Sequence, residues 1–82
     1  MAYIPPPNQL RGFPRAHKVR PKTVMDDGRK RRRWRDDDRI YEWDYQHGRV
    51  EVYDHRGRHQ GEADPDTGKL ITPPDPTRRI EP

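Results

Sequence analysis

The chain contains no cysteine, so it can build neither a disulfide framework nor a thiolate metal site. No apolar run approaches the roughly 20 residues that a transmembrane helix needs, and no membrane span is predicted. Core-forming residues are also scarce, because Leu, Ile, Val and Phe together number 11 of 82. Such a fraction combined with high charge is typical of disordered chains. A large hydrophobic core is therefore excluded.

The aromatic residues are unevenly placed, which favours a folded module over uniform disorder. Four of the seven lie between Tyr41 and Tyr53. Prolines recur within the first 25 residues and forbid a regular helix there, so an extended backbone is expected. We therefore expect a proline-rich N-terminal arm at residues 1–28 and a small β-sheet module at residues 29–82. Within the arm, the residues that could hold it against a sheet are Leu10, Phe13 and Val19.

The stretch from Ile40 to Tyr53 has the alternation of a β-hairpin. A turn at residues 45–48 would pair Asp44 with Arg49 and Trp43 with Val50. Successive side chains of a strand point to opposite faces, so one face would be apolar and the other ionisable. The apolar face would carry Tyr41, Trp43, Val50 and Val52, and the other Glu42, Asp44, Arg49, Glu51 and Tyr53.

Two further short strands are predicted after the hairpin, at residues 58–63 and 69–71. They are separated by Asp-Pro-Asp-Thr-Gly at 64–68, a strong turn sequence. About four strands joined by tight turns predict a strongly twisted antiparallel sheet. The expected fold class is thus mainly β: a single small domain with an irregular, basic N-terminal arm.

Charge is divided between two parts of the chain. Residues 11–40 hold 12 Lys or Arg against 5 Asp, a net charge of +7, whereas residues 41–82 hold 6 against 9 acidic residues, a net charge of −3. The basic run indicates a phosphate-binding patch with an embedded aromatic ring that could stack on a base. For that ring, Trp34, the alternative is packing inward from a charged strand. The candidate RNA-binding residues here are Arg29, Lys30, Arg31, Arg32, Arg33, Trp34 and Arg35.

The polar face of the hairpin could cleave RNA through attack by the RNA's own 2′-hydroxyl. A base removes the hydroxyl proton, an acid protonates the departing 5′-oxygen, and a cation stabilises the charge on phosphorus. Glu51, His47 and an arginine would suffice, with no metal and no cofactor. Asp44 lies at a suitable sequence distance to orient the imidazole. Spacing alone leaves a solvated polar face as the alternative, since hairpins with one histidine are common.

Other polar clusters do not predict a metal site. His55 and His59 are four residues apart but fall in a predicted turn and strand, so each is expected to be solvated or hydrogen-bonded. Asp36, Asp37 and Asp38 would point in alternating directions on a strand, and a turn or charge balance is expected instead.

Several motifs, taken in order, resemble one known family. They are Pro21-Lys22-Thr23, the basic run ending at Trp34, Glu42-Trp43-Asp44, Gln46-His47-Gly48, Asp64-Pro65, Thr67-Gly68 and Pro74-Asp75-Pro76. Together they resemble the cytotoxic ribonuclease domain of the ribosome-inactivating colicins of the E-three type and of cloacin, over roughly residues 20–80. The resemblance implies a metal-independent endoribonuclease that cuts 16S ribosomal RNA at the decoding site of the small ribosomal subunit.

The resemblance also implies roles for individual residues. The family's catalytic positions fall on Asp44, His47, Glu51 and Arg78. It implies that Glu51 is the base and that Arg78 stabilises phosphate, and it leaves open whether His47 or Asp44 protonates the leaving group. Two further residues are carried as RNA contacts: Tyr53, which matches a family position, and Arg79, which would replace Arg78 if the alignment slips by one.

By the same resemblance we expect a monomeric C-terminal toxin part of a larger secreted or contact-delivered protein, acting in the cytoplasm of a target bacterium. A cognate acidic immunity protein is the expected protein partner. Two alternatives remain at this point. One is a non-catalytic RNA-binding module that uses the same basic arm, and the other is the same fold cutting another RNA, such as tRNA.

Overall fold

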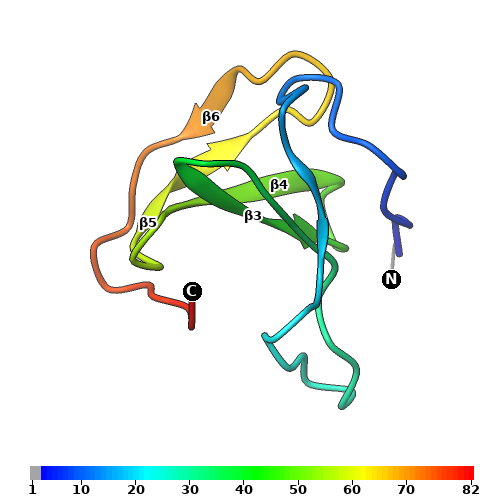
Figure 1. Cartoon of the computed structure of the whole chain (residues 1–82). Coiled ribbons are helices and arrows are strands. Elements are labelled where there is room, and N and C mark those ends of the chain that lie inside the picture. The colour runs from blue at the N-terminus through cyan, green and yellow to red at the C-terminus, as the bar shows by residue number, and fades with distance from the viewer. Residues whose placement is uncertain (1–2) are drawn as a thin grey trace.

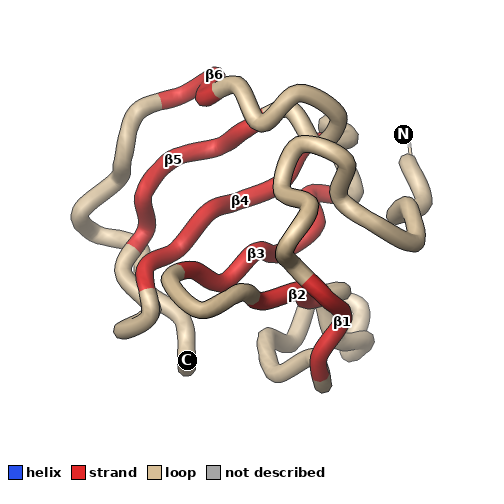
Figure 2. The backbone as a smooth tube through the Cα atoms, turned by 45° about the horizontal axis from the view of Figure 1, so that its top comes forward, coloured by secondary structure: helices blue, strands red, loops and turns tan. Residues whose placement is uncertain are grey.

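The computed structural model describes residues 3–82, which form one antiparallel sheet of six strands with strand order β1-β2-β3-β4-β5-β6 (Figures 1 and 2). Each strand pairs with its sequence neighbours, so the sheet is a continuous meander. The described residues contain no helix, and hence none that could cross a membrane. The strands are β1 (His17–Val19), β2 (Arg33–Arg35), β3 (Arg39–Asp44), β4 (Arg49–Asp54), β5 (His59–Ala63) and β6 (Leu70–Thr72).

The central hairpin has the predicted register. Asp44 lies opposite Arg49, and Trp43 lies opposite Val50. The turn at residues 45–48 ends at Gly48, whose φ of 69° is in the left-handed region that glycine adopts without steric cost. The alternation therefore places the apolar and ionisable side chains on opposite faces, as predicted.

The mainly β class is confirmed, but the strand count differs from the prediction of about four. The two additional strands, β1 and β2, are three residues each and come from segments interpreted as arm and phosphate-binding run. Trp34 of β2 lies opposite Tyr41 of β3, and Lys18 of β1 lies opposite Trp34. Short, polar strands carry little propensity signal of their own, because pairing with a neighbouring strand, β2 for β1 and β3 for β2, decides whether they form.

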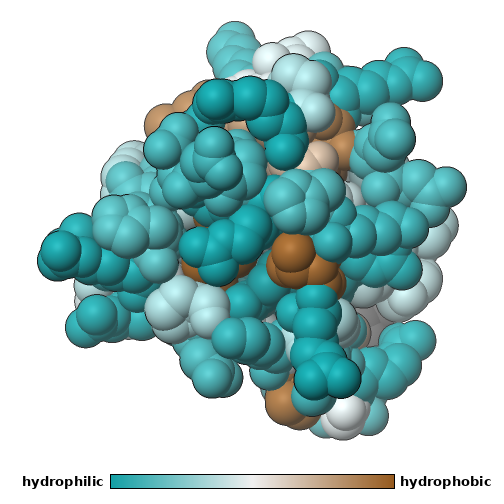
Figure 3. All heavy atoms as spheres, viewed as in Figure 1, coloured by the Kyte–Doolittle hydropathy of each residue, from teal (hydrophilic) through white to brown (hydrophobic). Residues whose placement is uncertain are grey.

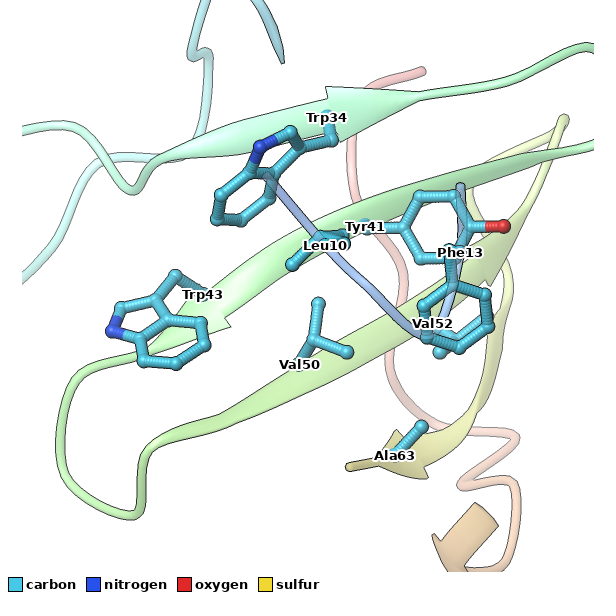
Figure 4. Close-up of a cluster of buried hydrophobic side chains, with 8 residues drawn as sticks. All are labelled: Leu10, Phe13, Trp34, Tyr41, Trp43, Val50, Val52 and Ala63. Atoms are coloured by element: carbon cyan, nitrogen blue, oxygen red, sulfur yellow. The ribbon is translucent and has the colours of Figure 1, made fainter. Parts of the chain in front are cut away.

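The core lies on the apolar face of the hairpin and is completed by the N-terminal segment (Figure 4). Leu10 and Phe13 pack against this face, and the Phe13 and Tyr41 rings lie 4.6 Å apart. The side chains of the core are Leu10, Phe13, Trp34, Tyr41, Trp43, Val50, Val52 and Ala63. Outside this small core the surface is mainly hydrophilic, with isolated apolar patches on the face drawn in Figure 3.

The N-terminal segment is held down by backbone contacts as well as by its apolar side chains. The backbone NH of Gly12 donates to the carbonyl of Pro65, at 2.8 Å. A Cβ atom at Gly12 would collide with the backbone of Gly68, so only glycine permits this approach. The segment therefore docks against the turn between β5 and β6. Of the three residues proposed to hold it, Leu10 and Phe13 are buried, whereas Val19 is only half-buried.

Two members of the predicted phosphate-binding run, Arg33 and Trp34, are buried, and for Trp34 this is the inward packing that the sequence left as an alternative. The Trp34 ring is fully buried and lies edge-on to Trp43, so it cannot stack on a base. Arg33 points to the opposite face, where its guanidinium donates to Glu42 Oε2 at 2.9 Å and 3.2 Å. Thr23 also donates to that oxygen, at 2.6 Å. Pairing of β2 with β3 buries both faces of this strand, which a continuous run of basic residues does not reveal.

Candidate active site

The ionisable face of the hairpin forms the floor of a cleft of about 510 Å³. The C-terminal segment after β6 borders this cleft. Two backbone hydrogen bonds hold it there, from the NH of Ile80 to the carbonyl of Gly57 and from the NH of His59 to the carbonyl of Arg78. The cleft brings together all four predicted catalytic residues. Its polar lining includes Arg31, Asp44, His47, Glu51, His59, Glu62, Asp75 and Arg78.

Asp44 is the last residue of β3, and it organises the hairpin turn. One carboxylate oxygen accepts hydrogen bonds from the backbone NH groups of Gln46 and His47, and the other lies 2.7 Å from His47 Nδ1. Burial alone would raise the pKa of Asp44, but hydrogen bonds from Glu62, His47 and the turn outweigh burial and lower that pKa. Asp44 is therefore ionised at neutral pH, and His47 Nε2 is left unbound by the carboxylate.

Glu51 lies in the middle of β4 with both carboxylate oxygens engaged. Its Oε1 is 2.8 Å from His59 Nε2, and its Oε2 is 3.2 Å from a guanidinium nitrogen of Arg78. Burial would raise the pKa of Glu51, but hydrogen bonds from His59, Glu62 and Arg78, with the charge of Arg78, lower it below its ordinary value. The buried carboxylate is thus ionised and positioned, as a general base must be.

His59 reaches this site because of a β-bulge. Val52 pairs with Gly61 whereas Tyr53 pairs with His59, so one residue of β5, Gln60, is left over. The bulge rotates the start of β5 and directs the buried His59 ring towards Glu51. The backbone NH of Asp75 donates to His59 Nδ1 at 2.9 Å, so Nε2 carries the hydrogen donated to Glu51. Sequence reasoning predicted a hydrogen-bonded His59 but did not place it in the site.

Glu62 is the other site residue that sequence reasoning missed. It lies directly opposite Glu51 in the pairing of β4 with β5, and its only arginine contact in the described residues is Arg49 at 3.2 Å. Burial, hydrogen bonds with Asp44 and Glu51, and the charge of Glu51 raise the pKa of Glu62 to about 7. The alternation of residues 58–63 could have predicted that Glu62 lies on this face. It could not have predicted that Glu62 lies close to Asp44.

Asp44, His47 and Glu62 each offer a potential ligand atom, and these atoms lie within 4.8 Å of one another. However, the Asp44 oxygen and the His47 nitrogen are hydrogen-bonded to each other, and Glu62 accepts a hydrogen bond from Arg49. The three side chains therefore form a hydrogen-bonded group within the larger cleft. Asp36, in the other acidic cluster, accepts backbone hydrogen bonds from Asp38 and Arg39, which is the turn expected for it.

The predicted RNA-binding residues occupy different positions around the cleft. Arg31 lines the cleft, where it donates to the carbonyl of Trp43 at 3.1 Å. Arg29 and Lys30 are exposed, whereas Arg32 and Arg35 are half-buried. These four residues and Arg31 thus remain able to contact phosphate, unlike Arg33 and Trp34.

The two C-terminal candidates differ in position. Tyr53 is buried, and its hydroxyl accepts a hydrogen bond from Arg78 at 3.1 Å. Tyr53 therefore holds the Arg78 side chain, and its burial leaves little of it to contact RNA directly. Arg79 is exposed and lines a separate depression on the side of Pro74 and Pro76. Arg78, not Arg79, is the arginine that contacts Glu51.

Comparisons with known proteins agree with the resemblance found in the motifs. A family model described as Cytotoxic matches residues 4–81. Cloacin from Escherichia coli is 42% identical over 85 residues, which covers 96% of this chain. Colicin E3 from the same organism is 48% identical over 65 residues, covering 74% of this chain. The chain spans only 15% of cloacin and 12% of colicin E3, so it corresponds to a small part of either protein.

Proposed function

The chain belongs to the family described as Cytotoxic, and from that membership we propose that it is a bacterial toxin ribonuclease. We propose that it cleaves 16S ribosomal RNA at the decoding site of the small ribosomal subunit and so blocks translation. The observation that carries this proposal is the cleft that holds Asp44, His47, Glu51 and Arg78 together. A binding module has no need of a buried, ionised carboxylate beside an imidazole and a guanidinium.

In the proposed reaction, Glu51 is the general base. It accepts the proton of a ribose 2′-hydroxyl while the 2′-oxygen attacks the adjacent phosphorus, and the bond from phosphorus to the 5′-oxygen breaks. His59 and Arg78 keep the carboxylate oriented, since each binds one of its oxygens. Arg78 also stabilises the negative charge that develops on the phosphoryl oxygens. The products are a 2′,3′-cyclic phosphate and a 5′-hydroxyl, and the reaction requires no metal or cofactor.

The general acid in this proposal is His47, with Asp44 as the residue that orients it. The lowered pKa of Asp44 makes it a poor proton donor at neutral pH. By contrast, its 2.7 Å contact with His47 Nδ1 fixes the orientation of the imidazole and leaves Nε2 to protonate the departing 5′-oxygen. The side chain of His47 is 53% exposed, so a substrate can reach it.

RNA is held by the basic residues that border the cleft. Arg31 and Arg78 lie in its wall, and Arg29, Lys30 and Arg32, which flank Arg31 in the chain, add positive charge. Arg35 lines a separate depression with Arg20 and Lys22. Such contacts bind phosphates without reading sequence, so selection of one site must come from the shape of the RNA or its surroundings.

Partners and location follow from the same family membership. Because the relatives are bacteriocins, we propose that the chain is delivered to a target bacterium and acts in its cytoplasm as a monomer. A cognate immunity protein of acidic character would neutralise it. The chain itself carries a formal net charge of +4, which fits such a partner.

Cleavage of purified bacterial ribosomes tests the proposal directly. Wild-type protein in the presence of EDTA should release one fragment from the 3′ region of 16S RNA, and its 5′ end should map to the decoding site. Binding without any cleavage would instead indicate an RNA-binding module. Fragments derived from tRNA in total bacterial RNA would leave the chemistry in place and change the target.

The pH dependence of cleavage should be bell-shaped. Because the pKa of Glu51 lies below its ordinary value, the base should remain ionised until the pH falls below about 4.5. The alkaline limb should report the general acid, which must be protonated to act. Single-turnover rates measured on ribosomes across this range check the assignment. A flat profile from about pH 5 to about pH 9 would contradict a base and an acid of this kind.

A further inference from the structure

Glu62 has no role in the reaction described above, although it lies at the centre of the cleft. Its side chain is 9% exposed, and its carboxylate is within 4.8 Å of the potential ligand atoms of Asp44 and His47. The register of β4 and β5 also places it directly opposite Glu51. Glu62 therefore lies between the carboxylate that orients the proposed acid and the carboxylate of the proposed base.

Three carboxylates in one cleft repel each other, and a proton shared among them lowers the free energy of the group. The hydrogen bonds decide which carboxylate takes that proton. Asp44 is bound by two backbone NH groups and His47, and Glu51 is bound by His59 and Arg78. Among the described residues, the one cationic partner of Glu62 is Arg49, whose side chain is 39% exposed.

The other charged groups around Glu62 do not change this assignment. The strands and segments that border the same cleft contribute His47 from the hairpin turn, His59 from the start of β5, and Asp75 and Arg78 from the C-terminal segment. His47 is hydrogen-bonded to Asp44, and His59 and Arg78 contact Glu51. The Asp75 carboxylate accepts hydrogen bonds from the backbone NH and the hydroxyl of Thr77. On β6, Thr72 accepts a hydrogen bond from the backbone NH of Glu62, not from its carboxyl group.

We propose that Glu62 is a positioning residue whose protonated carboxyl group donates a hydrogen bond to Asp44 or Glu51, and whose ionised form weakens binding of RNA phosphate. This inference rests on the proposed function for its consequence, but its first part concerns the protein alone. With the proton in place, the sheet floor of the cleft carries two negative charges, those of Asp44 and Glu51, and the cleft lining also holds Arg31 and Arg78. When the proton leaves, a third negative charge faces the scissile phosphate.

The state of Glu62 can be measured without RNA. We expect the side-chain carboxyl carbon of Glu62, observed by ¹³C NMR and assigned by its absence in E62Q, to titrate with a midpoint of about 7, because burial and the neighbouring carboxylates raise its pKa. Titration near the ordinary value of glutamate, about 4.3, would overturn the proposal. The test does not depend on whether the protein cuts any RNA.

The effect on binding is tested with a 2′-O-methylated decoding-site RNA, which cannot be cleaved because it lacks a free 2′-hydroxyl. Wild-type protein and E62Q should bind this RNA equally at about pH 6. At about pH 8 the wild type should bind it about tenfold more weakly than E62Q does, as expected for one added charge near a phosphate. Glutamine keeps the size and a hydrogen-bond donor of the protonated acid. E81Q, at an exposed position, is the matched control and should follow the wild type.

The two proposals fail in different ways. If the ratio of wild-type to E62Q dissociation constants is the same at both pH values, Glu62 has only a structural role and the inference is wrong. If the ratio changes with pH as expected but ribosomes remain uncut by the wild type, the ribonuclease proposal fails and the role of Glu62 in the cleft stands.

Discussion

Replacing Glu51 by glutamine is expected to reduce ribosome cleavage by about 10²- to 10⁴-fold, the usual contribution of a general base. Glutamine has the size of glutamate and can still bind Arg78 through its amide oxygen, but it cannot accept the 2′-hydroxyl proton. The affinity for RNA should be unchanged or slightly higher, because a negative charge is lost from the cleft. The expected change therefore lies in the rate of the chemical step.

Single-turnover cleavage of ribosomes and the dissociation constant of the 2′-O-methylated RNA separate these two quantities. E81Q makes the same chemical change at an exposed site and should retain the wild-type rate. Thermal unfolding of E51Q checks that the sheet is intact. An E51Q protein that cleaves within threefold of the wild-type rate would exclude Glu51 as the base and leave the proposed mechanism without one.

Replacing Arg33 by methionine is expected to lower the free energy of unfolding by about 3–5 kcal/mol, as when one partner of a buried ion pair is removed. Arg33 and Glu42 are almost completely buried, with side chains 3% and 1% exposed. Without the guanidinium, Glu42 would keep only Thr23 as a side-chain partner, and its Oε1 already has none among the described residues. A domain of this length has a total stability of roughly 4–12 kcal/mol, so much of it would be lost.

Arg32→Met is the matched control because it removes the same charge one residue earlier, at a half-buried position. It should leave stability within about 0.5 kcal/mol and weaken RNA binding, with a smaller dependence of affinity on salt. Urea unfolding and RNA titrations at several salt concentrations measure both effects. If Arg33→Met unfolds like the wild type and Arg32→Met does not, the burial described for β2 is wrong.

Removing both members of the buried pair extends this test. Arg33→Met combined with Glu42→Leu should recover most of the stability lost in Arg33→Met alone, because no charge is then left buried without a partner. The coupling between the two changes measures the interaction that the structure assigns to them. Additive effects would show that Arg33 and Glu42 are not in contact in solution.

Local alternation in the sequence determined the hairpin and much of the site. The period of two over residues 40–53 requires Asp44 and Glu51 to share one face and Trp43 and Val50 the other, whatever surrounds them. The turn at residues 45–48 fixes the pairing of Asp44 with Arg49 and brings His47 back over Asp44. These relations are short in sequence and depend on backbone geometry alone, so they could be predicted from the residues.

Only the tertiary structure decided which other residues join the hairpin. A bulge at Gln60 directs His59 to Glu51, and the register of β5 sets Glu62 beside both carboxylates. Pairing of β2 with β3 buries Arg33 and Trp34, which the sequence presents as part of one basic run. The physical reason is the same in each case: strand register and burial depend on contacts between residues distant in sequence, and no local pattern of charge or hydropathy encodes them.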